Sequence, residues 1–120
     1  QAKDTKNEPY MAIGGYVPVE KVYSLEPTNG LKEEQKKYIV GVQANLWTEY
    51  ITSVDQIEYM LLPRMAALSE VQWMQPAQKN YENFLQRLDN LAKLYQREGL
   101  NAKHVFTSQP VESCETPKEE

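Results

Sequence analysis

The sequence predicts part of a parallel α/β fold that is rich in helix when taken alone. Residues 38–42, Tyr-Ile-Val-Gly-Val, form a β-branched run typical of a strand covered on both faces. Two segments with apolar residues at helical spacing follow, over about 53–73 and 76–98. A single strand cannot satisfy its own backbone groups, and a complete eight-unit barrel takes about 250 residues. We therefore expect these 120 residues to be a fragment of a larger fold.

The stretch before the strand is expected to be mostly loop. Residues 1–10 are polar and contain Pro9, which indicates irregular structure. Residues 17–23 predict a short helix with Pro18 in its first turn, and Pro27 follows closely enough to prevent a longer one. Residues 32–37 are a charged approach to the strand.

Two longer helices are predicted after the strand. Ser53 and Gln56 have the spacing of a capping box, which predicts a helix from Ser53 to about Trp73, bent at Pro63. Its apolar positions are numerous enough to predict wide burial: Val54, Ile57, Leu61, Met65, Leu68 and Val71. The second helix is predicted to open at Pro76 and to stop at Gly99. Its apolar stripe consists of Tyr81, Phe84, Leu85, Leu88, Leu91 and Tyr95.

Composition excludes several classes of function. The 13 basic and 17 acidic residues give a formal charge of −4, without the basic stripe that a nucleic-acid partner requires. No apolar run approaches the roughly 18 residues of a membrane segment. A single cysteine excludes an internal disulfide framework and a clustered thiolate zinc site. Residues 105–120 are too poor in apolar groups to fold alone, so we expect a folded part over 1–104 and a disordered tail over 105–120.

Two paired motifs carry a family resemblance. Residues 41–50 read Gly-Val-Gln-Ala-Asn-Leu-Trp-Thr-Glu-Tyr, and residues 58–73 contain Pro-Arg, a small-residue run and Glu-x-x-Trp. Over about residues 1–104 the chain resembles the carboxyl-terminal end of bacterial glycoside hydrolase family 20, the β-N-acetylhexosaminidases. The resemblance implies a (β/α)8 TIM barrel, in which the strand from Tyr38 is the eighth and the helix from Val54 closes the ring.

The resemblance assigns substrate-binding roles to two residues. The matching Trp47 would form a wall of the subsite for the terminal N-acetylhexosamine, and Glu49 would hydrogen-bond a ring hydroxyl. Strand alternation would direct both side chains to one side of the barrel mouth. An indole covers the apolar face of a sugar, and a carboxylate accepts hydroxyl protons strongly. Without the resemblance, Trp47 would be a core aromatic and Glu49 a solvated carboxylate. Tyr50 is a further candidate for the sugar entrance.

The implied activity needs residues outside this chain. The family resembles retaining glycosidases in which the substrate's own 2-acetamido oxygen is the nucleophile, assisted by an Asp-Glu pair on an earlier strand. That pair, and a Tyr-x-Asp element, match positions before Gln1. The resemblance thus implies an exo-β-N-acetylhexosaminidase that removes terminal N-acetylhexosamine from glycoconjugates, without a cofactor or metal. Its partners are this carbohydrate and the remainder of the barrel. The chain alone is expected to be inactive, and the intact protein to be secreted or periplasmic.

Several other charged side chains have structural interpretations. Asp55 and Glu58 place negative charge near a helix amino end, and no chemistry is assigned to them. Arg64 lies within an apolar run, so its guanidinium is expected to bind backbone carbonyls or a carboxylate, with Glu70 as a plausible companion.

A second hypothesis belongs to another functional class. The chain could be a small helical interaction module, without catalytic activity, whose stripe from Tyr81 to Tyr95 binds a partner protein. His104 has no Asp, Ser or Cys at motif spacing and is interpreted as a surface residue. Cys114 has acidic neighbours that do not favour its thiolate.

Overall fold

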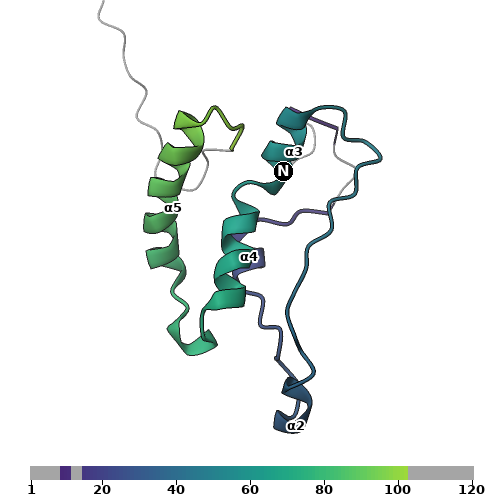
Figure 1. The fold of residues 1–120 in the computed structure, drawn as a ribbon, viewed down its shortest axis with the longest axis vertical. Helices are drawn as coiled ribbons and strands as arrows, with labels where there is room; N and C mark the ends of the chain where they lie inside the picture. Colours follow the sequence, from purple (N-terminus) through teal and green to yellow (C-terminus); the bar gives the residue numbers. More distant parts are fainter. Residues whose placement is uncertain (1–8, 12–14, 103–120) are drawn as a thin grey trace, which may run out of the picture.

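The computed structural model describes residues 9–11 and 15–102 of the chain. These residues form helices packed side by side, with a long extended segment beside them (Figure 1). The helices are α1 (Val19–Tyr23), α2 (Glu33–Lys36), α3 (Val54–Leu61), α4 (Arg64–Trp73), the 3-10 helix η2 (Pro76–Gln78) and α5 (Tyr81–Arg97). The prediction that the chain is helix-rich when taken alone is confirmed over the described residues.

The short helix α1 relies on neighbouring structure because a helix of one turn is unstable alone. α1 lies within the predicted range 17–23, with Pro18 at its N-cap. It packs on α4, and its last residue, Tyr23, is 4% exposed. The loop that follows α1 is tied to the start of α5, where Lys79 Nζ donates to the Leu25 carbonyl at 2.9 Å and pairs with Glu26 at 2.6 Å. The charged approach at 32–37 contains the one-turn helix α2, which the sequence did not predict.

The predicted helix from Ser53 to Trp73 is two helices. Ser53 is the N-cap of α3, as predicted, and its Oγ accepts from the Gln56 amide at 3.2 Å. The chain then breaks at Leu62, which is extended, before α4 begins at Arg64. The prediction of a bend was too mild because proline both removes a donor and disfavours the α conformation of the residue before it.

The start of the last helix also differs from its prediction. Pro76 opens the 3-10 turn η2, whereas α5 begins at Tyr81 with the Asn80 side chain accepting from the Asn83 amide at 2.9 Å. Asn80 is the better start because its side chain can accept the first free amides of a helix. The stop at Gly99 is confirmed: Gly99 has φ +72°, which favours glycine.

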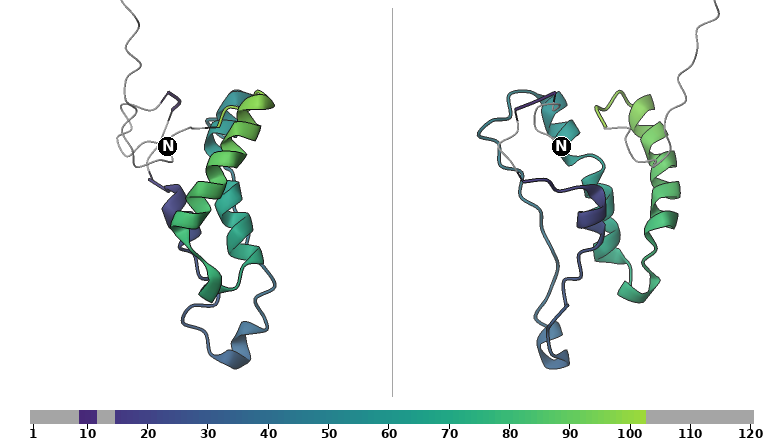
Figure 2. Two further views of the ribbon diagram at one scale, coloured as in Figure 1. Left: turned by 90° about the vertical axis from the view of Figure 1, so that its left-hand side faces the viewer. Right: turned by 180° about the vertical axis from the view of Figure 1, so that it is seen from behind.

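The core lies where α1, α4 and α5 meet. Tyr23, Ala67, Phe84 and Leu88 are buried there together. The Tyr23 and Phe84 rings stack with their centroids 4.7 Å apart. α4 and α5 run in opposite directions, and α1 covers α4 from another side (Figures 1 and 2). Part of the apolar stripe of α5 therefore packs in the chain's own core, which leaves less of it for the partner of the interaction-module hypothesis.

The predicted strand at 38–42 does not form a strand in the described part of the chain. These residues begin an extended segment that runs up beside α4 and α3 (Figure 1). Gln72 Nε2 donates to the Val42 carbonyl at 2.9 Å, and Val40 is 99% exposed. A strand requires a neighbouring strand to pair its backbone groups, and residues 9–11 and 15–102 provide none. The prediction of a formed strand is therefore wrong for the chain taken alone.

The prediction that the helix over 53–73 is widely buried is confirmed only in part: Val71 is buried, and Ile57, Leu61 and Leu68 are half-buried. Val54 is 67% exposed, and Trp73 is 87% exposed. Ala67 and Val71 of α4 are buried, whereas the surface of α4 that α1 and α5 do not cover stays exposed. The same helix pattern therefore leaves a large apolar surface on this chain.

Candidate functional site

The extended segment ends in an exposed turn just before α3. Trp47 is 74% exposed, and Glu49 lies two residues later on the same exposed stretch. The Ile51 amide donates to the Thr48 carbonyl at 3.1 Å and closes the turn. Residues 49 and 50 form a turn rather than a strand, so the common direction of Trp47 and Glu49 stays a prediction. Tyr50, the further candidate, is exposed beside them.

A buried side chain from α3 holds this turn. Gln56 is 4% exposed, although it carries a polar amide. Its Nε2 donates to the Tyr50 carbonyl at 3.2 Å, and its Oε1 accepts from the Thr52 amide at 3.0 Å. The capping-box spacing identified Gln56 as a residue at the helix start. It could not show that the side chain reaches back past Ser53 to the turn.

The exposed pair has the chemistry of a sugar subsite. An accessible indole offers a flat apolar face, and a carboxylate beside it accepts hydrogen bonds from hydroxyl groups. Neither side chain is needed in the core of the described residues. In the described part of the chain, the turn therefore leaves both side chains accessible.

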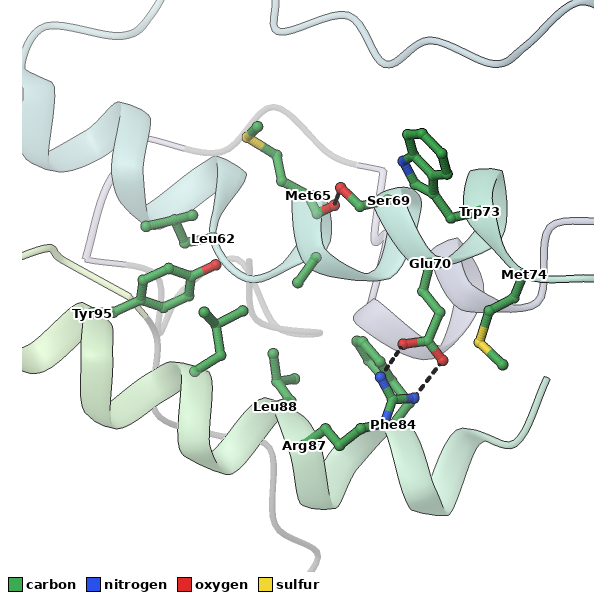
Figure 3. A pocket seen from close by; sticks show the side chains of 12 residues that line it. Leu62, Met65, Ser69, Glu70, Trp73, Met74, Phe84, Arg87, Leu88 and Tyr95 are labelled. Carbon is green, nitrogen blue, oxygen red and sulfur yellow. Dashed lines mark hydrogen bonds and ion pairs between the residues drawn. The ribbon is translucent and has the colours of Figure 1, made fainter. Parts of the chain in front are cut away.

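A second group of charged side chains joins three helices. Arg87 of α5 donates twice to Glu70 of α4, with both N–O distances 2.6 Å (Figure 3). The Tyr23 hydroxyl donates to the same carboxylate at 2.9 Å and accepts from the Asn80 amide at 2.9 Å. We call Tyr23, Glu70, Arg87 and Asn80 the interhelix network. Glu70, suggested as a companion of Arg64, instead binds Arg87.

The interhelix network shifts the pKa values of its members. The hydrogen bonds from Arg87 lower the pKa of Glu70, against a smaller rise from burial, and Tyr23 adds to the lowering. Burial raises the pKa of Tyr23, and its bond to Glu70 raises it further. The hydrogen bonds to Glu70 raise the pKa of Arg87. Glu70 is therefore held ionised by a bidentate partner, which suits a structural carboxylate and not a proton donor.

A groove of about 610 Å³ runs between α4 and α5 beside this network (Figure 3). Its walls are largely apolar and include Leu62, Met65, Leu91 and Tyr95. Trp47 and Glu49 do not line it. The candidate sugar residues and the groove are thus separate features of the chain.

The other predicted charged residues have structural partners. Arg64 donates from Nε to the Val17 carbonyl at 2.8 Å and from a terminal nitrogen to the Met60 carbonyl at 2.7 Å. The prediction of backbone carbonyls as its partners is confirmed. Asp55 lies in the first turn of α3, as expected for charge at a helix amino end. Glu58 accepts from the Asn101 amide at 2.7 Å and so ties α3 to the chain after α5.

Within residues 9–11 and 15–102, no three His, Cys, Asp or Glu side chains gather as a metal site would require. In the same part of the chain, no helix combines the length and apolar character needed to cross a membrane. His104, Cys114 and the predicted tail over 105–120 lie outside the described residues. The division into 1–104 and 105–120 stays a prediction.

Comparison with known proteins identifies the family. The model of the glycosyl hydrolase family 20 catalytic domain matches residues 1–76. The chain belongs to glycosyl hydrolase family 20. Both paired motifs lie within this match, so the family resemblance read from residues 41–50 and 58–73 is confirmed.

Similar proteins carry related names. A β-hexosaminidase of Porphyromonas gingivalis is 37% identical over 101 residues, which are 83% of this chain and 13% of that protein. A β-N-acetylhexosaminidase of Cellulomonas fimi is 30% identical over 96 residues, 80% of this chain and 19% of that protein. The crystal structure of a family 20 exo-β-N-acetylglucosaminidase from Vibrio harveyi, in complex with N-acetylglucosamine, matches with a TM-score of 0.67 and 30% identity. That match covers 72% of this chain and 14% of the other. This family 20 chain thus spans less than a fifth of these relatives.

Proposed function

We propose that this chain is the carboxyl-terminal part of the catalytic barrel of an exo-β-N-acetylhexosaminidase. Family membership supports this proposal, as do the names of the relatives from Porphyromonas gingivalis and Cellulomonas fimi. The chain spans only 13% and 19% of those two proteins, so the remainder of the barrel would come from the rest of the intact protein.

In this proposal the extended segment becomes the last barrel strand, and α3 and α4 become the closing helices. The route of the segment supports this assignment. Val42 is bonded to Gln72 near the end of α4, whereas Tyr50 is bonded to Gln56 near the start of α3. The segment and the helix pair therefore run antiparallel, as a strand and its following helix do in a (β/α) unit. The exposed side chains from Tyr38 to Val40 would be covered by neighbouring strands and helices.

Trp47 and Glu49 would then bind the terminal N-acetylhexosamine. The observation that carries this role is the position of Trp47 at the end of the extended segment, since strand ends form the active-site face of such barrels. Its indole would lie against the apolar face of the ring, and Glu49 would accept a hydrogen bond from a ring hydroxyl.

The reaction would remove terminal N-acetylhexosamine from glycoconjugates with retention, the substrate's 2-acetamido oxygen acting as nucleophile. The Asp-Glu pair that assists it would come from the remainder of the barrel, so this chain supplies binding groups and is inactive alone. A secreted or periplasmic location of the intact protein is part of the same proposal.

The test is kinetic and uses the intact enzyme. Trp47→Ala and Glu49→Gln should each lower kcat/KM for a p-nitrophenyl N-acetyl-β-hexosaminide more than tenfold. This loss equals about 1.4 kcal/mol or more of transition-state binding. Glu34→Gln is the matched control, since Glu34 is an exposed carboxylate of α2 far along the chain from the turn, and it should leave kcat/KM unchanged.

Near-normal kinetics of both Trp47→Ala and Glu49→Gln would show that the turn is not part of the sugar subsite. The isolated 120-residue chain should release no p-nitrophenol. Turnover by that chain would show that the acid is located within it.

A further inference from the structure

The turn with Trp47 and Glu49 is held by the buried side chain of Gln56. Within the described residues, the amide of this side chain makes no hydrogen bond to another side chain. Both bonds from the Gln56 side chain go to backbone groups, at 3.2 Å to the Tyr50 carbonyl and 3.0 Å to the Thr52 amide. These two groups flank Ile51, whose own amide closes the turn onto Thr48. Gln56 thus fixes the chain on the α3 side of the turn.

Only a side chain that both donates and accepts can make this pair of bonds. The Tyr50 carbonyl needs a donor, and the Thr52 amide needs an acceptor, so the orientation of the Gln56 amide follows from its partners. Because Gln56 is buried, losing either bond would leave a polar group without a partner. The turn is therefore held in one arrangement relative to α3.

Helix capping does not account for this side chain. One of the free amides in the first turn of α3, that of Gln56, donates to Ser53 Oγ at 3.2 Å. That bond is independent of the Gln56 side chain. The amide group therefore serves the turn, and Ser53 serves the helix.

We propose that Gln56 is a positioning residue for the sugar subsite. This inference rests on the proposed function. Gln56 does not touch the sugar; it sets where the turn carries Trp47 and Glu49 relative to the barrel mouth. A small displacement of binding groups is enough to lower the rate of a reaction that depends on substrate position.

The experiment measures coupling between Gln56 and Trp47 in the intact enzyme. Gln56→Met keeps the length of the side chain and removes both the donor and the acceptor. It should lower kcat/KM for a p-nitrophenyl N-acetyl-β-hexosaminide about tenfold in the natural background. In the Trp47→Ala background it should lower kcat/KM less than about threefold, because one of the two groups that it positions is gone.

Ser53→Ala is the matched control for damage to α3. It removes the N-cap bond and leaves both Gln56 side-chain bonds in place, so it should lower the melting temperature without lowering kcat/KM. A loss of activity in Ser53→Ala equal to that in Gln56→Met would show that helix stability, not the turn, controls the rate, and would overturn the inference.

Gln56→Glu provides a second readout, which also decides the question if Gln56→Met does not fold. An ionised carboxylate accepts from Thr52 but cannot donate to Tyr50, whereas the protonated acid can do both. The kcat/KM of Gln56→Glu relative to the natural enzyme should therefore rise as the pH falls from about 7 to about 5. A ratio that is constant with pH would contradict the donation to Tyr50.

The outcomes separate the two proposals. If neither Trp47→Ala nor Glu49→Gln lowers kcat/KM, the proposed sugar subsite is wrong, and the positioning role of Gln56 is wrong with it. If Trp47→Ala lowers kcat/KM and Gln56→Met does not, only the positioning role is wrong. Equal losses from Gln56→Met in both backgrounds would likewise overturn it.

Discussion

Tyr23→Phe tests how the interhelix network holds the three helices together. The substitution removes one hydroxyl and keeps the ring that stacks on Phe84. Two hydrogen bonds are lost, one to the Glu70 carboxylate and one from the Asn80 amide, each 2.9 Å long. A bond to a charged group contributes about 1.5–3 kcal/mol and a neutral one about 0.5–1.5 kcal/mol.

The expected loss of unfolding free energy lies near the lower end of the summed contributions of these two bonds. Glu70 keeps its two bonds from Arg87, and Asn80 is exposed, so its amide can bind water instead. We therefore expect Tyr23→Phe to lower the free energy of unfolding by about 1.5–2.5 kcal/mol. In a Glu70→Gln background the loss should shrink by about 1 kcal/mol, since the charged acceptor is absent.

The assay is urea denaturation at neutral pH, followed by circular dichroism, with the m value required to stay constant. Tyr95→Phe is the matched control. Burial raises the pKa of Tyr95 as it does that of Tyr23, yet its hydroxyl makes no hydrogen bond within the described part of the chain. If Tyr23→Phe lowers the free energy of unfolding no more than Tyr95→Phe does, the bonds of the Tyr23 hydroxyl to Glu70 and Asn80 do not stabilise the native state as argued.

Two further predictions concern acid stability and the end of α5. Because the pKa of Glu70 is lowered in the folded state, its stabilisation is complete above the ordinary value of 4.5 and is lost as the pH falls through the folded value. Unfolding free energies of the natural chain and Glu70→Gln should therefore converge on acidification, and a constant difference would contradict the pKa shift. Gly99→Ala should cost about 1–2 kcal/mol in the same assay because φ is +72° there, although a Cβ would meet nothing within 4 Å. Gly41→Ala, which has equal space and no positive φ, should cost nothing by comparison; equal losses would exclude backbone strain as the cause.

The helices were the part of the fold most readable from sequence. Ser53 as the start of α3 and Gly99 as the end of α5 depend on local chemistry, a side-chain oxygen for free amides and a residue that tolerates positive φ. The break at Pro63 was recognised but underestimated, because the sequence does not show how far neighbouring contacts offset a lost donor.

The strand was the part least determined by local sequence. Residues 38–42 have strand composition, yet the described chain keeps them extended beside α4 without a ladder. Strand formation depends on a second backbone at hydrogen-bonding distance, which composition cannot supply. The apolar surface of α4, including Trp73, is exposed for a related reason: no segment of the described residues covers it.

At the candidate site, sequence identified the residues and structure identified their supports. Trp47 and Glu49 were found from the paired motifs, and their roles remain the proposal made above. Neither spacing nor composition could assign Glu70 to Arg87, 17 residues away on another helix, in place of Arg64. The sequence did not predict the hydrogen bonds from Gln56 to the turn either.

The sequence by itself determined the family, the helix-rich character and the local helix signals of this protein, because each depends on residue type and short-range spacing. Only the tertiary structure decided which side chains meet across helices and what an extended segment becomes without a partner. The reason is that hydrogen bonds and burial between distant segments depend on where the chain brings them in space, and one-dimensional order does not specify that position.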